Sequence, residues 1–274
     1  NSQSFLTYSS ILAPPALKWE TTTTRDIGLD LDFFDNKLSL VADIYYNTTS
    51  DLLIESAIAT ESGYSSMMRN IGETSNKGLE IAINGVLYQN KNWKVTGGAN
   101  VAFNRNRIEK LGNQNSTLVS CGWAGSEISS DYILQEGKST GQMYGYVTDG
   151  YYSIDDFNYN SSTHSYTLKP GVTNDADIIA ANGNFGPGCI KLKDLDGDGI
   201  VSENDRTIIG NANPDATGGF SFKINYKKWD FGIDAYWSLG NDIYNANKIE
   251  FTTTNKYKYR NMTSEMESGK RWTN

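Results

Sequence analysis

The chain has few residues of the kinds that define catalytic and nucleic-acid-binding proteins. Its 274 residues include two cysteines and one histidine, and its 24 basic residues are outnumbered by 32 acidic ones, for a net charge of −8. Binding to nucleic acid calls for a basic face, so this balance argues against that class. His164 lies among Ser, Thr and Tyr, and we expect it to be a solvated loop residue. No thiol nucleophile, Ser/His/Asp set, zinc spacing or phosphate-binding loop is evident.

Long apolar runs are also missing. No stretch approaches the roughly 20 apolar residues that a transmembrane helix requires. The strand of a membrane barrel exposes only every second residue to lipid, so the low mean hydropathy of the chain does not exclude a membrane β-barrel. The sequence begins at Asn1 without an initiator methionine or a secretory apolar region, which we interpret as a start in mid-sequence.

The two cysteines, Cys121 and Cys189, fall in the same long loop. Outside the cytoplasm a disulfide between them is one interpretation. Two unpaired small residues are the other, and the sequence favours neither.

What the chain does have is alternation of apolar and polar residues with a period of two. The alternation occurs in three pairs of segments, at 27–46, 79–103 and 220–237, and a short turn joins the two segments of each pair, at 35–37, 89–92 and 226–228. Strict alternation places one face of a strand on an apolar medium and the other on water. No segment of comparable length shows helical periodicity.

Aromatic residues separate a membrane barrel from a soluble β-sandwich, which would show the same alternation. Those that bracket the turns are Phe33, Phe34, Tyr88, Trp93, Tyr226 and Trp229, and those further up the returning strands are Tyr45 or Tyr46, Phe103 and Trp237. At about 3.3 Å per residue and a tilt near 40°, the two sets are roughly 20–25 Å apart, the height of a barrel's apolar band. The sequence therefore predicts an all-β fold, with about six strands in three hairpins of an antiparallel transmembrane β-barrel.

Long polar loops connect the hairpins. Residues 55–72 and about 111–215 link one hairpin to the next, and residues 245–274 leave the last strand. In outer-membrane barrels the short turns face the periplasm and the long loops face outward. Six strands are too few to close a barrel. We therefore expect residues 1–274 to be a partial barrel domain, which is a piece of something larger or pairs with another chain.

One motif with metal chemistry lies at 194–205, within the long loop. Its candidate calcium ligands are Asp194, Asp196, Asp198, the carbonyl of Ile200, and Asp205. Ca²⁺ binds six to eight oxygens at about 2.3–2.6 Å, and Gly199 at the sixth position permits the sharp turn that brings them together. Asp205 replaces the Glu of a full EF-hand and flanking helices are not evident, so the motif predicts a bare, structural calcium loop. The alternative is a Gly/Asp-rich turn that needs no metal.

Aromatic residues also crowd the long loop. They are Trp123, Tyr144, Tyr146, Tyr151 and Tyr152. Such residues stack on sugars or bury the surface of a partner in some proteins, but more often they pack a large loop onto itself. We treat them as weak candidates for substrate or partner contact.

Several motifs occur together in one order along the chain. They are the segments 17–22 (LKWETT), 26–30 (DIGLD), 70–80 (NIGETSNKGLE), 194–199 (DLDGDG) and 205–210 (DRTIIG), followed by Pro214 and Gly218-Gly219. From about Leu17 to its end, the chain resembles the SusC/RagA-type TonB-dependent outer-membrane transporters. Cys189 departs from the pattern of that family before the calcium loop.

The resemblance implies a roughly 22-stranded barrel with a plug in its lumen. Such a transporter imports glycans or peptides across the outer membrane of a Gram-negative bacterium with energy from TonB, under a SusD-like surface lipoprotein that acts as a lid. This chain is then expected to be a C-terminal part of the barrel. The N-terminal plug domain would be absent, and so would the last strands, because residues 271–274 stop where the family continues.

We therefore predict a transport protein and not an enzyme, with outer-membrane lipid on the apolar face and the long loops extracellular. The polar side chains expected to face the lumen include Asp30, Asp43, Glu80, Lys94, Asn100 and Asp234. The long loop would contact the lid lipoprotein or the substrate. The alternative function is a soluble, secreted β-sandwich module that binds a surface and carries a calcium-ordered loop. A glycan-cleaving enzyme needs two carboxylates across a sugar, and nothing in the sequence promotes that class.

Overall fold

The structure is a computed structural model that describes residues 11–12, 16–58, 60–122, 130–179, 185–252 and 261–266. The chain divides into two compact units. The first, which we call the sheet unit, comprises Asn1–Thr117, Leu134–Gly141 and Ala212–Asp242. The second, the loop unit, comprises Leu118–Ile133, Gln142–Asn211 and Ile243–Asn274.

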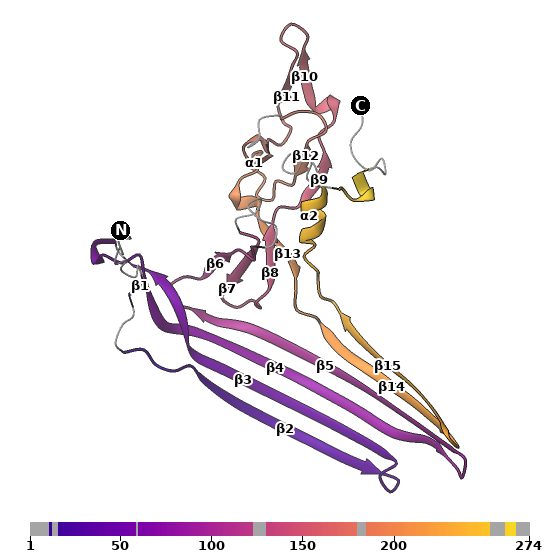
Figure 1. Cartoon of the computed structure of the whole chain (residues 1–274). Coiled ribbons are helices and arrows are strands. Elements are labelled where there is room, and N and C mark those ends of the chain that lie inside the picture. Colours follow the sequence, from indigo (N-terminus) through magenta and orange to yellow (C-terminus); the bar gives the residue numbers. More distant parts are fainter. Residues whose placement is uncertain are drawn as a thin grey trace, which may run out of the picture. The chain divides into compact units, whose positions relative to one another are not determined.

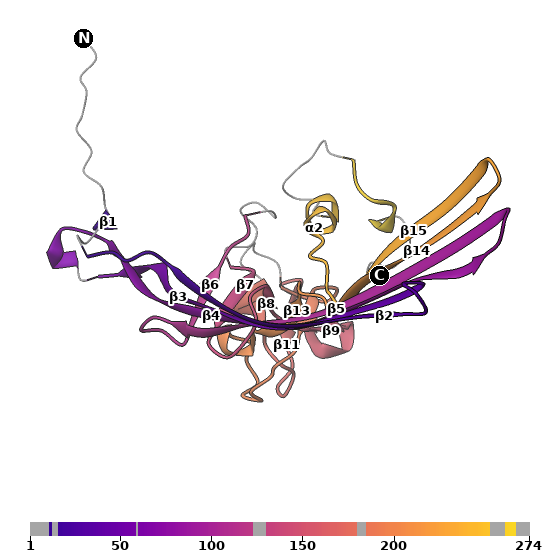
Figure 2. The same ribbon diagram turned by 90° about the horizontal axis from the view of Figure 1, so that it is seen from below.

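The sheet unit is built on one antiparallel sheet of long strands (Figure 1). Its strands are β2 (Thr21–Phe33), β3 (Leu38–Ala57), β4 (Ser66–Gln89), β5 (Trp93–Leu111), β14 (Ala216–Tyr226) and β15 (Trp229–Leu239), and the short β1 (Ile11–Leu12) pairs in parallel with the start of β4. The order across the sheet is β15-β14-β5-β4-β3-β2. Figure 2 shows this sheet edge-on as a single curved layer. The long strands of this unit form one sheet, whereas the predicted β-sandwich alternative requires two.

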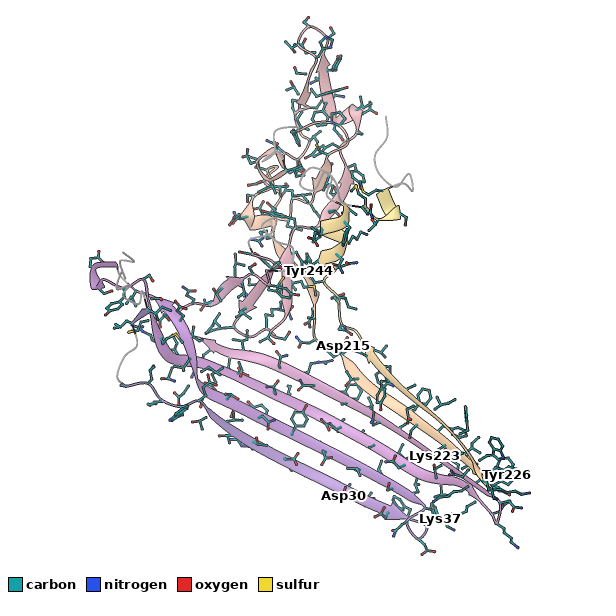
Figure 3. The ribbon with its side chains drawn as sticks, in the orientation of Figure 1. Asp30, Lys37, Asp215, Lys223, Tyr226 and Tyr244 are labelled. Carbon is teal, nitrogen blue, oxygen red and sulfur yellow. The ribbon has the colours of Figure 1, made fainter. Side chains whose placement is uncertain are left out.

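The three hairpins form where the sequence predicts them. Residues 34–36 between β2 and β3 take positive φ values of 54° to 62°, and so does Lys227 between β14 and β15, at 53°. In the β4–β5 turn the side-chain oxygen of Asn90 accepts the backbone N–H of Trp93 at 2.8 Å. Lys37 and Tyr226 mark the end of the sheet where all three turns lie (Figure 3).

Strand register gives the sheet one apolar and one polar face. One row across the sheet reads Leu31, Leu40, Ile83, Ala99, Phe220 and Ala235, and its neighbour on the opposite face reads Asp32, Ser39, Asn84, Gly98, Ser221 and Asp234. Residues directly opposite each other on paired strands point to the same side, so these rows define the two faces. On the apolar face large side chains are exposed, with Ile27 at 78% and Trp229 at 79%.

The strands are longer than the sequence predicts. The expected loop at 55–72 is largely strand, because β3 continues to Ala57 and β4 begins at Ser66. The pairing passes through a register shift between Thr49 and Leu52. A bulge of this kind interrupts the period of two, which hid the outer ends of both strands from the sequence pattern.

The loop unit consists of small sheets and short helices. Its elements are β8 (Gln142–Gly145), β9 (Thr148–Tyr151), β10 (Phe157–Asn160), β11 (Ser165–Leu168), β12 (Ile190–Leu192), β13 (Thr207–Asn211), α1 (Ala176–Ile179) and α2 (Ala246–Thr252). Strand β9 pairs with β12, and β10 pairs with β11. The third small sheet has the order β13-β8-β7-β6, with β7 at Tyr132–Gln135 and β6 at Ser116–Val119. In the part of the chain that the structure describes, no helix is long and apolar enough to cross a bilayer.

An aromatic cluster forms the core of the loop unit. Tyr152 is fully buried, and the centroid of its ring lies 5.0 Å from that of Phe185 and 5.6 Å from that of Phe157, both edge-on. The Tyr152 hydroxyl donates a hydrogen bond of 2.7 Å to the carbonyl oxygen of Thr173. Burial raises the pKa of Tyr152, and the nearby Asp175 raises it further. This cluster joins Tyr152 to Phe185, more than thirty residues away along the chain.

Candidate functional site

The loop at 194–205 brings three carboxylates together. The side-chain oxygens of Asp194, Asp196 and Asp198 lie within 4.8 Å of one another. Gly197 and Gly199 adopt φ values of 80° and 88°, in the left-handed region that glycine enters without strain. The glycines therefore allow the turn that the spacing of the motif requires.

Backbone N–H groups orient these carboxylates. The two oxygens of Asp194 accept from Gly197 at 2.6 Å and from Gly199 at 2.8 Å. An oxygen of Asp198 accepts from the N–H of Ile200 at 2.7 Å. These local bonds hold the carboxylates within the loop. The side chain of Ile200 is half exposed, and its backbone forms an isolated parallel bridge with Asn174.

Asp205 has a different environment from the three clustered carboxylates. Its side chain is fully buried. One oxygen accepts the N–H groups of Leu195 at 2.7 Å and Asp196 at 3.3 Å, and the other accepts from Ser202 at 2.8 Å. The N–H of Ser202, followed by that of Leu195, holds the pKa of Asp205 below its ordinary value. The carboxylate thus links the two ends of the loop.

The charges of the loop suit a divalent cation. The N–H of Asp198 lowers the pKa of Asp196, but desolvation and the neighbouring carboxylates of Asp198, Asp205 and Asp194 outweigh it, so the net shift is upward. A raised carboxyl pKa means that the ionised cluster repels itself. Carboxylate oxygens are among the hard ligands that Ca²⁺ takes.

Two of the aromatic candidates, Tyr144 and Tyr146, lie against a cation. The guanidinium carbon of Arg206 is 4.7 Å from the ring centroid of Tyr144 and 5.9 Å from that of Tyr146. Arg206 also donates to the carbonyl oxygen of Ser130 at 2.6 Å. A hollow of about 510 Å³ lies beside this stack, and its lining also includes Tyr244.

Tyr244 lies in a partly desolvated environment within the loop unit (Figure 3). Burial, followed by the charges of Asp131 and Cys121, raises its pKa to about 12. The Sγ of Cys121 donates to a carboxylate oxygen of Asp131 at 2.5 Å. Cys121 and Cys189 are not joined by a disulfide. Arg206 lies in the motif segment 205–210, but the sequence did not indicate its partners Ser130 and Tyr144, which are far away along the chain. Tyr244 was not singled out by any sequence pattern.

The remaining aromatic candidates differ in their exposure to solvent. Tyr152 belongs to the buried core, so the structure removes it from the set of contact residues and assigns it to packing. Tyr151 is half exposed and is available for contact. Trp123 lies outside the described residues.

The side chains predicted to face the lumen share the polar face of the sheet. Their strand register places them there, and they are Asp30, Asp43, Glu80, Lys94, Asn100 and Asp234. Figure 3 shows Asp30 on β2. A shallow hollow of about 620 Å³ on the sheet is lined by Asp43, Glu80 and Asn100 together with Thr217 and Tyr236. Tyr236, which the sequence did not single out, is 86% exposed.

One tyrosine on the polar face crosses a neighbouring strand. Tyr45 on β3 extends over Gly78 on β4, and its hydroxyl donates to the side-chain oxygen of Asn104 on β5 at 3.1 Å. A Cβ on Gly78 would overlap the ring of Tyr45. The glycine of the segment NIGETSNKGLE is therefore the residue that lets this ring lie flat on the sheet.

Comparison with known proteins assigns the chain to a family of membrane β-barrels. Residues 2–168 match the profile of the family described as TonB dependent receptor-like, beta-barrel. The chain belongs to this family. The resemblance noted in the sequence is confirmed, and so is the predicted fold, an antiparallel segment of a larger barrel.

The TonB-dependent receptor relatives are several times longer than this chain. TonB-dependent receptor P3 of Formosa agariphila is 34% identical over 234 residues, which cover 85% of this chain and 22% of that protein. TonB-dependent receptor SusC of Bacteroides thetaiotaomicron is 27% identical over 272 residues, covering 94% of this chain and 24% of SusC. The chain thus spans less than a quarter of the length of these relatives.

A solved structure has the same fold. The chain matches a structure of the RagAB peptide transporter with a TM-score of 0.57 and 27% identity, over 82% of this chain and 22% of the other. The match extends the similarity to the SusC/RagA type and supports the assignment of the sheet as a piece of barrel wall.

Proposed function

We propose that the chain forms part of the wall of a TonB-dependent importer in the outer membrane of a Gram-negative bacterium. The observation that carries this proposal is the sheet itself. One face exposes Ile27, Ile44 and Phe231, whereas the other presents carboxylates and amides. A single layer with such faces is stable where lipid covers one side and an aqueous lumen lies on the other. In this arrangement the short turns face the periplasm and the loop unit is extracellular.

The cargo that we propose is an oligosaccharide or a peptide, taken up together with a SusD-like surface lipoprotein. Support comes from the relatives, of which one is SusC and another is described as a peptide transporter. The half-exposed Tyr151, and the stack of Tyr144 and Tyr146 on Arg206, offer surfaces on the loop unit for substrate or lid.

Gene deletion tests this function with the whole protein. The source bacterium without the gene is grown on single oligosaccharides and on single peptide mixtures as the carbon source. We expect a growth defect on one class alone, and restoration by the intact gene but not in a strain that lacks TonB. Affinity purification of the tagged transporter should recover a surface lipoprotein. Unchanged growth on every substrate, together with purification of the transporter alone, would contradict the proposal.

We further propose that Ca²⁺ orders the loop at 194–205. The convergent oxygens of Asp194, Asp196 and Asp198 would bind the ion, with the carbonyl of Ile200 as a further ligand. Asp205, whose oxygens accept three backbone N–H groups, would hold the loop closed around it. The proposed role is structural, because the bound cation would neutralise the repulsion among the carboxylates and cross-link the loop.

Terbium luminescence and proteolysis of the full-length transporter test the calcium proposal. Asp196→Asn removes one exposed ligand and one charge, whereas Asp177→Asn removes an exposed carboxylate on α1 outside the loop and serves as the control. We expect Asp196→Asn to weaken Tb³⁺ binding and the control to leave it unchanged. Chelation by EDTA should increase cleavage within 111–215, and unchanged cleavage would refute the role of calcium.

A further inference from the structure

Basic residues lie in a row across the apolar face of the sheet. Strand register places Arg25 on β2, Tyr46 on β3, Lys77 on β4 and Arg105 on β5 directly beside one another. We call these four residues the basic row. The side chains two residues nearer the short turns are Ile27, Ile44, Leu79 and Phe103. Because side chains two residues apart on a strand share a face, the basic row belongs to the apolar face.

At this level of β2 to β5, the basic side chains lie on the apolar face and not on the polar face. The adjacent row on the polar face reads Asp26, Tyr45, Gly78 and Asn104, and the next reads Thr24, Asn47, Asn76 and Asn106. Neither row carries a basic side chain. Solubility of the strand ends alone would not favour one face over the other, so the one-sided placement points to an anionic ligand on the apolar side.

Within the described residues, two of the three cations have no carboxylate partner. Arg105 pairs with Asp215 at 3.0 Å. Arg25 lies over the ring of Tyr46, with its guanidinium carbon 5.9 Å from the centroid. Among the residues that the structure describes, Arg25 and Lys77 form no ion pair, and both are exposed. Their strands flank β3, so their Cα atoms are about 10 Å apart, within reach of a single headgroup.

The row also stands at the edge of the apolar band. Between it and the short turns, the side chains of β2 to β5 on the apolar face include no charged residue. Arg25 and Phe33 are eight residues apart on β2, which is about 26 Å along the strand and roughly 20 Å along the normal of a bilayer for a tilt near 40°. A membrane that covers the apolar face would therefore place its headgroups at the basic row.

We propose that the basic row binds the phosphate groups of lipid headgroups in the leaflet on the long-loop side. The inference rests on the proposed placement of the apolar face in the outer membrane. Guanidinium and ammonium groups pair strongly with phosphate oxygens. Arg25 and Lys77 supply the cations that would bind phosphate, and Tyr46 lies between them at the membrane interface. Arg105 is the third cation of the row and is paired with Asp215.

The test is native mass spectrometry of the full-length transporter in detergent, titrated with monophosphoryl lipid A, with the same lipid after dephosphorylation, and with inorganic phosphate. The variant R25Q/K77Q removes two positive charges from the apolar face. Its matched control, K94Q/K223Q, removes two from the polar face. R25Q/K77Q should weaken binding of the phosphorylated lipid on the order of tenfold.

The control variant and the charge-retaining R25K/K77R should bind the phosphorylated lipid as the wild type does. Equal binding by R25Q/K77Q, equal binding of the dephosphorylated lipid, or displacement of the lipid by stoichiometric inorganic phosphate would each overturn the assignment. Membrane fractionation separates this failure from failure of the proposed function. A transporter found in the outer membrane with lipid binding unaltered by R25Q/K77Q refutes the basic row alone, whereas absence from the outer membrane refutes the importer.

Discussion

The ring of Tyr45 over Gly78 supports a quantitative prediction. Gly78→Ala would force the Tyr45 ring off the strand and break its hydrogen bond to Asn104. The lost bond costs about 1 kcal/mol, and displacement of the ring from its contacts adds a similar amount. Against this, alanine in a strand interior is favoured over glycine by about 0.5–1 kcal/mol. We therefore expect Gly78→Ala alone to reduce the free energy of unfolding by about 1 kcal/mol.

The effect of Gly78→Ala on the free energy of unfolding should change sign when the Tyr45 ring is absent. In a Tyr45→Ala background only the gain from alanine remains, so Gly78→Ala should stabilise the protein by about 0.5–1 kcal/mol. The interaction energy of this double-mutant cycle is then about 1.5–2 kcal/mol. Urea unfolding of the four full-length variants in detergent micelles measures it. An effect of Gly78→Ala that is the same in both backgrounds would refute the reasoning.

Two further predictions concern the loop unit, and limited proteolysis of the full-length protein checks both. Tyr152→Phe removes the hydroxyl that bonds to Thr173 and should destabilise the unit by about 1–3 kcal/mol. Tyr152→Ala empties the aromatic core and should cost about 3–5 kcal/mol, and equal cleavage of the two variants would contradict this. Arg206→Lys keeps the charge but loses the planar stack on Tyr144 and should cost about 1 kcal/mol, while cleavage at the wild-type rate would show that the stack contributes nothing.

The sheet could be predicted from the sequence because its signal is local. Alternation such as Ile27, Leu29, Leu31 identifies a strand without knowledge of its neighbours. The alternation of apolar and polar residues is interrupted at the register shift between Thr49 and Leu52 of β3, and the sequence signal ended there. Local pattern therefore gave the existence and order of the strands but not their full length.

The candidate site was predictable only where it is contiguous in sequence. Spacing alone identified Asp194, Asp196 and Asp198, and the structure brings their oxygens together. Spacing also suggested Asp205 as a ligand, but could not show that its carboxylate accepts backbone N–H groups within the loop. The burial of Tyr152 depends on Phe185, more than thirty residues away, and no local pattern encodes that contact.

The most direct test of the central claim, that the sheet is a membrane wall with lipid on one face and water on the other, is spin-label accessibility. Nitroxides are attached to cysteines at Asp43 and Ile44, neighbours on β3 that point to opposite faces, after Cys121 and Cys189 have been replaced by serine. In the full-length transporter in lipid bilayers, the label at 44 should collide with oxygen and be shielded from a water-soluble nickel chelate. The label at 43 should show the reverse. Equal exposure of both labels to the nickel chelate would contradict the membrane wall.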